Sequence, residues 1–432
     1  MRIFKLENSI QNYAWGSADG FEQCLGIPNP SGVPAAELWM GAHPKALSMA
    51  IRGSERVPLD RLIGEDPAAY LGTEAADRFG RGLPFLFKAL SAARPLSIQA
   101  HPAKRKAERG FDRENLQGIP VGAPERNYRD SNHKPEMTVA LTRFEGLCGF
   151  RPVAEIIENI KLVTPESHAR FSGRLERNPG RIELSVFFYS LISLAADVKR
   201  TMIGSSTKRI TRLLESGQVP GDKREAFEWV LRLEALYPGD IGALMPILFN
   251  HIVMEPGEGL YIAPGEPHAY LRGTALEIMA NSDNVIRGAL TEKHIDIPEL
   301  VSVLTFNPTR LTPALPRAME GHPEESLYAV EAPDFMLSRI RLSESARELA
   351  SNPRASISSA GENYIERLPQ GPEILLCLGP SVEIRCADKL LELERGESAF
   401  VSADAGSYRL RGSGEVFRAS VPSREAAAKT RS

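Results

Sequence analysis

The spacing of apolar residues divides the chain into regions of two kinds. Residues 1–150 contain short apolar or alternating runs, such as residues 83–90, separated by turns rich in glycine and proline. Runs of this length and alternation predict β-strands. From residue 153 onward the apolar residues recur every three or four positions, which predicts helices. The apolar positions of the first predicted helix are Val153, Ile156, Ile157, Ile160 and Val163.

Strand-like runs return at residues 255–270, where short apolar stretches alternate with Gly- and Pro-containing turns. Such punctuated short strands are typical of a double-sheet jelly roll. The patterns therefore predict a chain that is mainly β with an inserted α-helical domain. We expect a jelly-roll domain made of residues 1–151 and 251–319, a helical domain made of residues 152–250, and a C-terminal jelly-roll-like β domain made of residues 320–432.

Two of the strand-rich segments resemble each other. Aligned without gaps, residues 255–273 and 394–412 share six identical residues in nineteen positions. A repeat of this kind predicts two related β domains. Because His268 falls opposite Ser407 in the alignment, we expect the second domain to lack the chemistry that His268 supports and to have a structural role.

Composition excludes several classes of function. The chain has 432 residues, of which 25% are charged, and a formal net charge of −3. A nucleic-acid-binding protein would carry a basic excess, so no nucleic-acid partner is expected. The longest uncharged apolar run, residues 184–196, is shorter than the roughly 20 residues of a membrane-spanning helix, so no membrane partner is expected either. The absence of a signal-peptide pattern and of any CxxC pair among the four cysteines favours a cytoplasmic location.

The segment of residues 94–102 carries the first candidate ligands. In an extended chain, successive side chains point to opposite faces, so Ser97, Gln99 and His101 share one face of this predicted strand. That face is polar, whereas the opposite face, with Ile98, can pack against a core. An amide and an imidazole on one face are candidate metal ligands.

A second segment, residues 132–136, complements the first. Pro135 favours an extended conformation at the residue before it, so Lys134 and Glu136 also share a face. His268 follows a tight Gly/Pro turn and becomes a fourth candidate ligand beside an amide, an imidazole and a carboxylate. Nitrogen and oxygen ligands of these types suit zinc. Taken alone, His268 has the equally ordinary interpretation of a packed or surface histidine.

The charged residues elsewhere indicate the kind of substrate. Lys88, Lys134, Arg287 and Lys293, together with the hydroxyl of Ser97, favour an anionic, hydroxyl-rich molecule such as a sugar phosphate. No glycine-rich loop opens a helix, so neither ATP nor a dinucleotide is an expected ligand. The spacing of residues therefore predicts a metal-assisted reaction on a small anion, without selecting the reaction.

Two of these features have an alternative structural interpretation. A lysine within an apolar strand, as Lys88 is, usually extends its ammonium group to solvent. Trp15 and Trp39 lie in Gly-rich segments, where an aromatic side chain either borders a site or packs in the core. The sequence alone leaves both alternatives open.

Several segments resemble type I mannose-6-phosphate isomerases, and the resemblance covers residues 1–310. The segments are QNYAWGS at 11–17, AELWMGAHPKA at 36–46, LPFLFKAL at 83–90, PLSIQAHP at 95–102, NHKPEM at 132–137 and ALEIMANSDNVIRGALTEK at 275–293. The resemblance implies a cupin-type jelly roll with a helical domain and a further β domain. It also implies an enzyme with one zinc ion per chain that interconverts mannose 6-phosphate and fructose 6-phosphate. Separately, we expect the protein to be a monomer.

The resemblance further implies roles for individual residues. The implied zinc ligands are Gln99, His101, Glu136 and His268. The implied catalytic residues and candidates for ring opening and proton transfer are Arg287, Lys134, Lys88, Asp283 and His133. The implied substrate-binding residues are Ser97, Trp15, Glu277 and Lys293.

The implied reaction is isomerisation through a cis-enediol, in which a base moves a proton between C2 and C1 of the sugar. Lys88 or Lys134 is the hypothetical base, on the condition that its surroundings lower its pKa. Two other functions are possible. A non-catalytic sugar-phosphate-binding protein would not need all four ligands and Arg287, and a different metal-dependent cupin enzyme, such as an oxygenase, would favour a ligand set richer in histidine.

Overall fold

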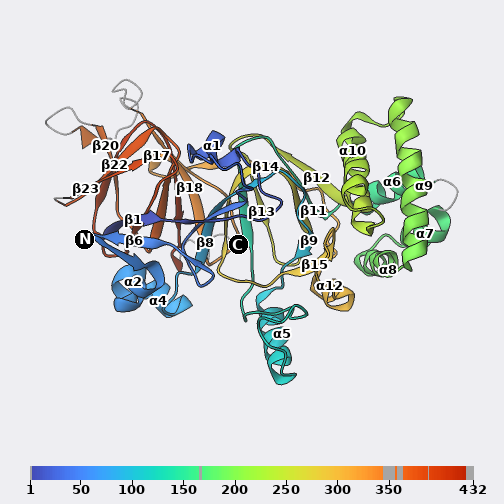
Figure 1. Ribbon diagram of the computed structural model, residues 1–432, viewed down its shortest axis with the longest axis horizontal. Coiled ribbons are helices and arrows are strands. Elements are labelled where there is room, and N and C mark those ends of the chain that lie inside the picture. Colours follow the sequence, from blue (N-terminus) through green and yellow to red (C-terminus); the bar gives the residue numbers. More distant parts are fainter. Residues whose placement is uncertain (1, 165–167, 344–355, 358–362, 388, 425–432) are drawn as a thin grey trace.

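The computed structural model describes residues 2–164, 168–343, 356–357, 363–387 and 389–424. Figure 1 shows β-sheets stacked across one side and the centre of the molecule, with a group of helices gathered at the opposite end. The expectation of a mainly β chain with inserted helices is confirmed. None of the helices in the described part of the chain is long and apolar enough to cross a membrane.

The ten-stranded sheet, as counted over the described residues, builds what we name the first β domain. Its main path is β12 (Phe249–Met254), β11 (Phe144–Phe150), β14 (His268–Ala280), β8 (Phe85–Ala92), β3 (Glu37–Met40) and β2 (Ser9–Gln11). The strands that pair off this path are β9 (Ile98–Ala100), β10 (Glu136–Ala140), β13 (Gly259–Ile262) and β15 (Ile286–Ala289).

Strand β14 bends this sheet into two facing halves. Its first residues pair with β9 and β11, whereas its residues from Gly273 onward pair with β8 and β10. The φ angle of Gly273 is 116°, and a Cβ atom there would lie 2.7 Å from the carbonyl oxygen of Arg143. Glycine is required at this bend because an L side chain rarely adopts such a φ and has no space.

Two further sheets face each other and form what we name the second β domain. Among the described residues, one has nine strands, in the order β16 (Arg317–Met319), β17 (His322–Leu327), β18 (Met336–Leu342), β26 (Gly414–Ser420), β21 (Glu373–Cys377), β24 (Ser398–Val401), β1 (Ile3–Glu7), β6 (Met49–Arg52) and β7 (Glu55–Pro58). The other has five described strands, in the order β19 (Ser356–Ile357), β20 (Asn363–Arg367), β25 (Tyr408–Gly412), β22 (Ser381–Cys386) and β23 (Lys389–Glu394). A small hairpin joins β4 (Ala42–His43) to β5 (Ala46–Leu47).

The nine-stranded sheet contains strands from both ends of the chain. Strand β1 lies between β24 and β6, so residues 3–58 contribute three strands to a sheet otherwise made of residues after 316. The division of the chain by ranges did not anticipate this exchange. Its cause is long-range pairing, such as that of Phe4 with Phe400, which leaves no local signal in the sequence.

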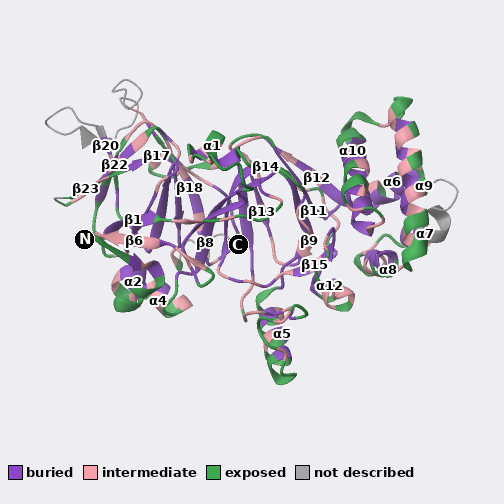
Figure 2. Cartoon of the chain, viewed as in Figure 1, coloured by how far each residue is buried: buried purple, intermediate pink, exposed green. Residues whose placement is uncertain are grey.

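Because successive side chains point to opposite faces of a strand, one face of β8 packs in a core between two sheets and the other lines the interior of the first β domain. On β8, Phe87 and Ala89 face the nine-stranded sheet, where they join a core with Phe4 and Phe400. Leu90 and Lys88 point the other way, into the space between the two halves of the ten-stranded sheet. Figure 2 shows that buried residues concentrate along the strands of the stacked sheets. The first β domain therefore has an interior of its own, lined by both apolar and polar residues.

A group of helices covers the outer face of the first β domain (Figure 1). They are α6 (Val153–Val163), α7 (His168–Arg177), α8 (Arg181–Ile192), α9 (Ala196–Glu215), α10 (Gly221–Leu236), the 3-10 helix η1 (Ile241–Leu244) and α11 (Met245–Leu248). Leu147 and Leu271 on the sheet pack with Phe188 and Phe227 on the helices. The helical pattern of residues 184–203 is interrupted, because Ala195 adopts an extended conformation between α8 and α9.

The remaining helices are short or lie at the edges of the sheets. They are α1 (Gly20–Leu25), α2 (Leu59–Glu65), α3 (Pro67–Leu71), α4 (Thr73–Phe79), α5 (Lys104–Leu116) and α12 (Ile297–Val303). Helix α5 projects from the molecule as a separate lobe (Figure 1). Tyr128, in the loop that follows α5, is fully buried and donates a hydrogen bond of 2.5 Å to Glu299 on α12, which ties the lobe to the first β domain.

The sequence repeat is also present in the structure. Strands β13 and β24 occupy corresponding positions, and each follows a turn with the same hydrogen bond. The Glu258 carboxylate accepts from the backbone N–H of Glu255 at 2.9 Å, and that of Glu397 accepts from the N–H of Glu394 at 2.9 Å. The two segments therefore share their backbone geometry as well as their residues.

Candidate metal centre and active site

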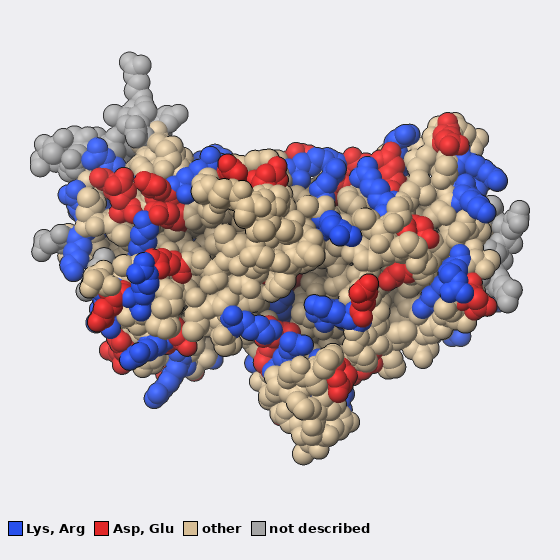
Figure 3. Space-filling model, in the orientation of Figure 1, with Lys and Arg blue, Asp and Glu red and all other residues tan. Residues whose placement is uncertain are grey.

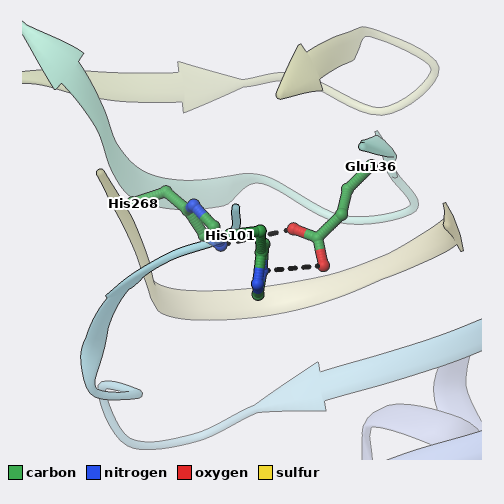
Figure 4. A group of neighbouring side chains, drawn as sticks. All are labelled: His101, Glu136 and His268. Carbon is green, nitrogen blue, oxygen red and sulfur yellow. Dashed lines mark ion pairs between the residues drawn. The ribbon is translucent and has the colours of Figure 1, made fainter. Parts of the chain in front are cut away.

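Three side chains of the first β domain converge in its interior. His101 follows β9, Glu136 begins β10 and His268 begins β14. One ligand atom from each residue lies within 4.8 Å of the other two, and all three residues are buried. The Glu136 carboxylate is 3.3 Å from Nε2 of His101 and 3.2 Å from Nε2 of His268 (Figure 4). Three residues that are distant in sequence therefore form one compact group.

The pairing of strands explains this convergence and adds Gln99 to it. Gln99 on β9 lies opposite His268 on β14 and also opposite Arg287 on β15. Its side-chain Nε2 is 3.3 Å from Nε2 of His268. The oxygen and nitrogen of an amide exchange places by rotation, so its carbonyl oxygen can turn to the same point. Four potential ligands thus surround one position.

Backbone carbonyls fix the orientation of both imidazoles. Nδ1 of His101 lies 2.6 Å from the carbonyl oxygen of Asn284, and Nδ1 of His268 lies 3.1 Å from that of Glu266. A carbonyl oxygen only accepts, so each Nδ1 carries the proton and each Nε2 keeps a lone pair directed at the other ligands. Burial, reinforced by the nearby Lys134 ammonium, lowers the pKa of His101 to about 4. His101 is therefore neutral at physiological pH, as a metal ligand must be.

The charge and hydrogen bonding of Glu136 fit a cation at this position. Burial alone would raise the pKa of Glu136, but Lys134 and His101 hold it well below its usual range. The Lys134 ammonium lies 2.6 Å from Oε1 of Glu136 and 3.4 Å from Nε2 of His101. The other oxygen, Oε2, is buried and has no hydrogen-bond partner among the described residues. An ionised carboxylate with one unsatisfied oxygen beside two imidazole lone pairs fits a divalent ion such as zinc.

A row of polar side chains crosses the interior next to this group. Trp39 on β3, Lys88 on β8, Glu277 on β14 and Thr138 on β10 are direct neighbours in the strand registers. The Lys88 ammonium pairs with the Glu277 carboxylate and lies 3.4 Å from that of Glu37. Burial would lower the pKa of Lys88, but these carboxylates raise it above its ordinary value. Lys88 is therefore protonated, and it does not meet the condition for a lysine base.

Tyr270 connects this row to the opposite half of the sheet. Its hydroxyl donates to the Glu277 carboxylate at 2.5 Å and lies 2.7 Å from the hydroxyl of Thr138. Burial, followed by the charge of Glu277, raises the pKa of Tyr270 well above its usual value, so the phenol remains a donor. The tyrosine thus fixes the orientation of the carboxylate that holds Lys88.

The segment of residues 281–293 borders the metal centre. Asp283 pairs with Lys45 at 2.8 Å and lies 3.5 Å from His43, so its carboxylate faces the hairpin of β4 and β5. Arg287 is half-buried, and burial together with the charge of Arg129 lowers its pKa. Two of the functional candidates on this segment, Asp283 and Arg287, therefore have different neighbours.

Three cations lie close together beside the site. Burial and then the charges of Arg287 and Arg129 lower the pKa of Lys293, so both guanidinium groups are near enough to act on its charge. In the described part of the chain, none of the three forms an ion pair with an acidic residue. Figure 3 shows Lys and Arg side chains beside the hollow next to the α5 lobe. Adjacent cations without acidic partners are typical of an anion-binding site.

Three further predicted residues, His133, Trp15 and Ser97, have surroundings of their own. His133 pairs with Asp334 at 2.7 Å, because alternation along the chain directs it away from Lys134 and Glu136. Trp15 is partly buried, packs against the apolar core of the first domain and stacks on Tyr13 at 5.9 Å. Ser97 is half-buried just before β9.

Reasoning from the sequence did not identify four residues that contact or orient the residues of this site. They are Glu37, Arg129, Tyr270 and Asn284. Arg129 lies close to the predicted motif NHKPEM but outside it, and the other three gain their partners only through strand registers and loop contacts. A search for acidic and aromatic residues on the same face as Lys88 and His268 would have found Glu37 and Tyr270.

Comparison with known proteins gives a consistent family. The profile described as "Phosphomannose isomerase type I, catalytic domain" matches residues 3–153. Over 415 residues the chain is 38% identical to mannose-6-phosphate isomerase of Salmonella typhimurium, covering 96% of this chain and 98% of that protein. The chain belongs to the mannose-6-phosphate isomerase family. This confirms the resemblance found in the sequence motifs.

Other members of the mannose-6-phosphate isomerase family support the same assignment. The human protein of that name is 34% identical over 368 residues, covering 80% of this chain and 84% of that protein. A crystal structure of mannose 6-phosphate isomerase described as "holo; zinc bound" superposes with a TM-score of 0.84 and 37% identity, covering 98% of this chain and 100% of that chain. The similarity therefore extends over both β domains and the helices.

Proposed function

We propose that this protein is a zinc-dependent aldose–ketose isomerase that interconverts mannose 6-phosphate and fructose 6-phosphate. The observation that supports this most strongly is the convergence of His101, Glu136 and His268 in a chain of this family. Both imidazoles direct a lone pair towards a carboxylate oxygen that has no other partner. A binding protein without catalytic activity would not require this arrangement, and no observation favours that alternative.

In this proposal one zinc ion per chain is held by four residues. They are Gln99, His101, Glu136 and His268. When bound, zinc supplies Lewis acidity that favours charge on the O1 and O2 oxygens of the sugar. The buried position of the ligands excludes bulk water, which strengthens electrostatic interactions within the site.

Cationic residues beside the metal centre bind the phosphate group in this proposal. Arg287 and Lys293 are the two expected from the sequence, and Arg129 is the one that the structure adds to them. An arginine presents a planar fork of donors to phosphate oxygens. Ser97 contributes a hydroxyl donor and Trp15 an apolar wall.

Proton transfer requires a group near C1 and C2 of the open-chain sugar. Of the two lysines, Lys134 remains the candidate for this role, because its Nζ lies among the proposed metal ligands and its partner carboxylate, Glu136, would share its negative charge with the zinc ion. Lys88, which Glu277 keeps protonated, donates a hydrogen bond to a sugar oxygen and stabilises negative charge on it. Asp283 and His133 remain candidates for ring opening. The pairing of His133 with Asp334 favours a role in holding the segment before Lys134.

The cellular setting is part of the proposal. The four cysteines are free thiols, which supports a reducing, cytoplasmic compartment. We propose that the protein acts as a monomer, without nucleic acid or membrane partners. Size-exclusion chromatography with light scattering would give a mass of one chain, and a stable dimer would contradict the monomeric state.

A coupled assay tests the enzymatic proposal directly. Fructose 6-phosphate formation from mannose 6-phosphate is followed with the purified protein, before and after treatment with a chelator. We expect turnover, its loss on chelation and its recovery on addition of zinc. No turnover in zinc-supplemented protein would contradict the proposal.

A further inference from the structure

Asn284 is a fully buried amide whose hydrogen-bonding groups are all used. Its Oδ1 accepts from the backbone N–H groups of Arg129 at 2.7 Å and Asp130 at 3.3 Å. Its Nδ2 donates to the backbone carbonyls of Asp130 at 2.8 Å and Asn132 at 2.8 Å. The oxygen faces donors and the nitrogen faces acceptors, so only one orientation of the amide satisfies the segment of residues 129–132.

The backbone carbonyl of Asn284 also orients a proposed metal ligand, His101. The Asn284 carbonyl oxygen accepts the Nδ1 proton of His101 at 2.6 Å. Asn284 therefore contacts two separate parts of the site. Its backbone carbonyl orients His101, and its side chain holds the segment that leads directly into Lys134 and Glu136.

Asp130 and Ser282 complete this contact. The Ser282 hydroxyl donates to Oδ1 of Asp130 at 2.8 Å and accepts from the N–H of Asn284 at 3.2 Å. Oδ2 of Asp130 accepts from the N–H of Asp283 at 2.7 Å. We name Asp130, Ser282 and Asn284 the Asn284 latch. The latch joins two loops, residues 129–132 and 282–284, that no pair of regular strands connects at this point.

We propose that Asn284 is a positioning residue for the metal centre. It keeps the two loops together, so that the ligand atoms of His101 and Glu136 meet at one position. The inference rests on the proposed zinc site. It assigns Asn284 a role that neither the metal ligands nor the substrate-binding cations fulfil, because the hydrogen bonds of its side chain, among the described residues, go to backbone groups and to the Asp130 carboxylate.

The variant Asn284→Asp keeps the shape of the side chain but replaces its hydrogen-bond donor, Nδ2, with an acceptor oxygen. Its second carboxylate oxygen replaces Nδ2 and faces the carbonyls of Asp130 and Asn132 and the carboxylate of Asp130. Acceptors then face acceptors in a buried place, and the two loops separate. Loss of a group that orients a metal ligand typically weakens metal binding by about 10- to 100-fold, and we expect a loss in this range.

The experiment measures zinc affinity of the full-length protein by competition with a chromophoric chelator, together with thermal stability. Asn159→Ala is the matched control, because Asn159 is also buried and donates to the carbonyl of Ile247 at 3.0 Å in the helical region. We expect both variants to lower the melting temperature and only Asn284→Asp to weaken zinc binding. Wild-type zinc affinity in Asn284→Asp would overturn the proposal.

Ser282→Ala tests the same inference with a milder change. It removes one hydroxyl from the latch, and we expect zinc binding to weaken by about threefold to tenfold, less than a full disruption of the latch. If Asn284→Asp does not fold, unchanged zinc affinity in Ser282→Ala overturns the proposal. At saturating zinc we expect both variants to recover turnover. Because zinc affinity is measured without substrate, absence of turnover in the wild type would contradict the proposed function and leave the latch inference standing.

Discussion

The interiors of the two β domains both contain buried carboxylates, but they differ in whether the carboxylate oxygens have partners. In the first domain, Oε2 of Glu136 is unsatisfied among the described residues, beside two imidazoles with free lone pairs. In the second domain, Arg418 binds Glu373 at 2.7 Å and Glu325 at 2.6 Å. Arg367 binds the second oxygen of Glu325 at 3.0 Å. The second interior neutralises its own carboxylates, whereas the first leaves a place for a cation.

The turn geometry that the two domains share does not explain why only the first interior leaves a place for a cation. The turns before β13 and β24 have matching hydrogen bonds, yet His268 has Ser407 as its counterpart, and Ser407 pairs with Glu366. Arginine stays protonated and is not a metal ligand, whereas a neutral imidazole is. The comparison teaches that a few residue positions, and not the fold, separate the candidate catalytic domain from the second β domain.

The largest expected effect comes from removing a ligand in one domain and its counterpart in the other. His268→Ala should lower turnover by more than about 100-fold, because even loss of a group that only orients a ligand costs about 10- to 100-fold. Ser407→Ala should leave turnover within about twofold of wild type, since it loses one exposed hydrogen bond. Steady-state assays at saturating zinc compare the two. Equal losses would show that the second domain takes part in the reaction.

A buried cation in each domain provides the next comparison. Lys88→Met should lower kcat by about 10²-fold or more, since a hydrogen bond to a charged sugar oxygen is lost. The conservative variant Lys88→Arg keeps the charge and should retain more activity. Unchanged kcat in Lys88→Met, with normal substrate binding, would remove Lys88 from the mechanism.

Arg418→Met should lower the stability of the protein and leave kcat unchanged, the reverse of what is expected for Lys88→Met. It leaves Glu325 and Glu373 buried without their main partner, and breaking a buried pair typically destabilises a protein by about 3–5 kcal/mol. We expect a lower melting temperature and a lower denaturant midpoint, with kcat unchanged below the unfolding transition. A reduced kcat at full folding would link the second interior to catalysis.

The smallest expected difference is in the response to acid of the zinc-free protein. The folded-state pKa of His101, about 4, is below its ordinary value, so the unfolded chain binds more protons between about pH 6.5 and pH 4. Stability from this group is complete above pH 6.5 and declines through that window, by on the order of 3 kcal/mol. The pKa of Glu325 is lowered because Arg418 and Arg367 outweigh its burial, so its contribution is lost only below about pH 4.5.

His101→Gln tests this order of events. Glutamine does not titrate, so the difference in unfolding free energy between wild type and variant should shrink as the pH falls from 6.5 to 4. Chemical denaturation at a series of pH values measures it. The control Asn159→Ala removes no titratable group, so its difference from the wild type should not change in that window. A wild-type and His101→Gln difference independent of pH would contradict a depressed pKa for His101.

The sequence carried enough information for the fold class and for grouping the ligand candidates. Alternation alone places Gln99 with His101 and Lys134 with Glu136, and helical spacing marks residues 152–250, because both patterns depend only on local backbone geometry. It did not show that Lys88 lies beside Glu277, since that contact depends on the register of β8 with β14. The Asn284 latch was equally hidden, because its partners are backbone groups of another loop.

The position of β1 has a consequence for how the chain is synthesised. β1 is translated before β6 but lies between β6 and β24, and β24 is translated much later than both. The nine-stranded sheet therefore closes only after β24 has been made, and contacts of such high sequence separation form slowly. Until then the apolar side chains of β1 lack their final neighbours, and transiently exposed apolar surface of this kind favours aggregation.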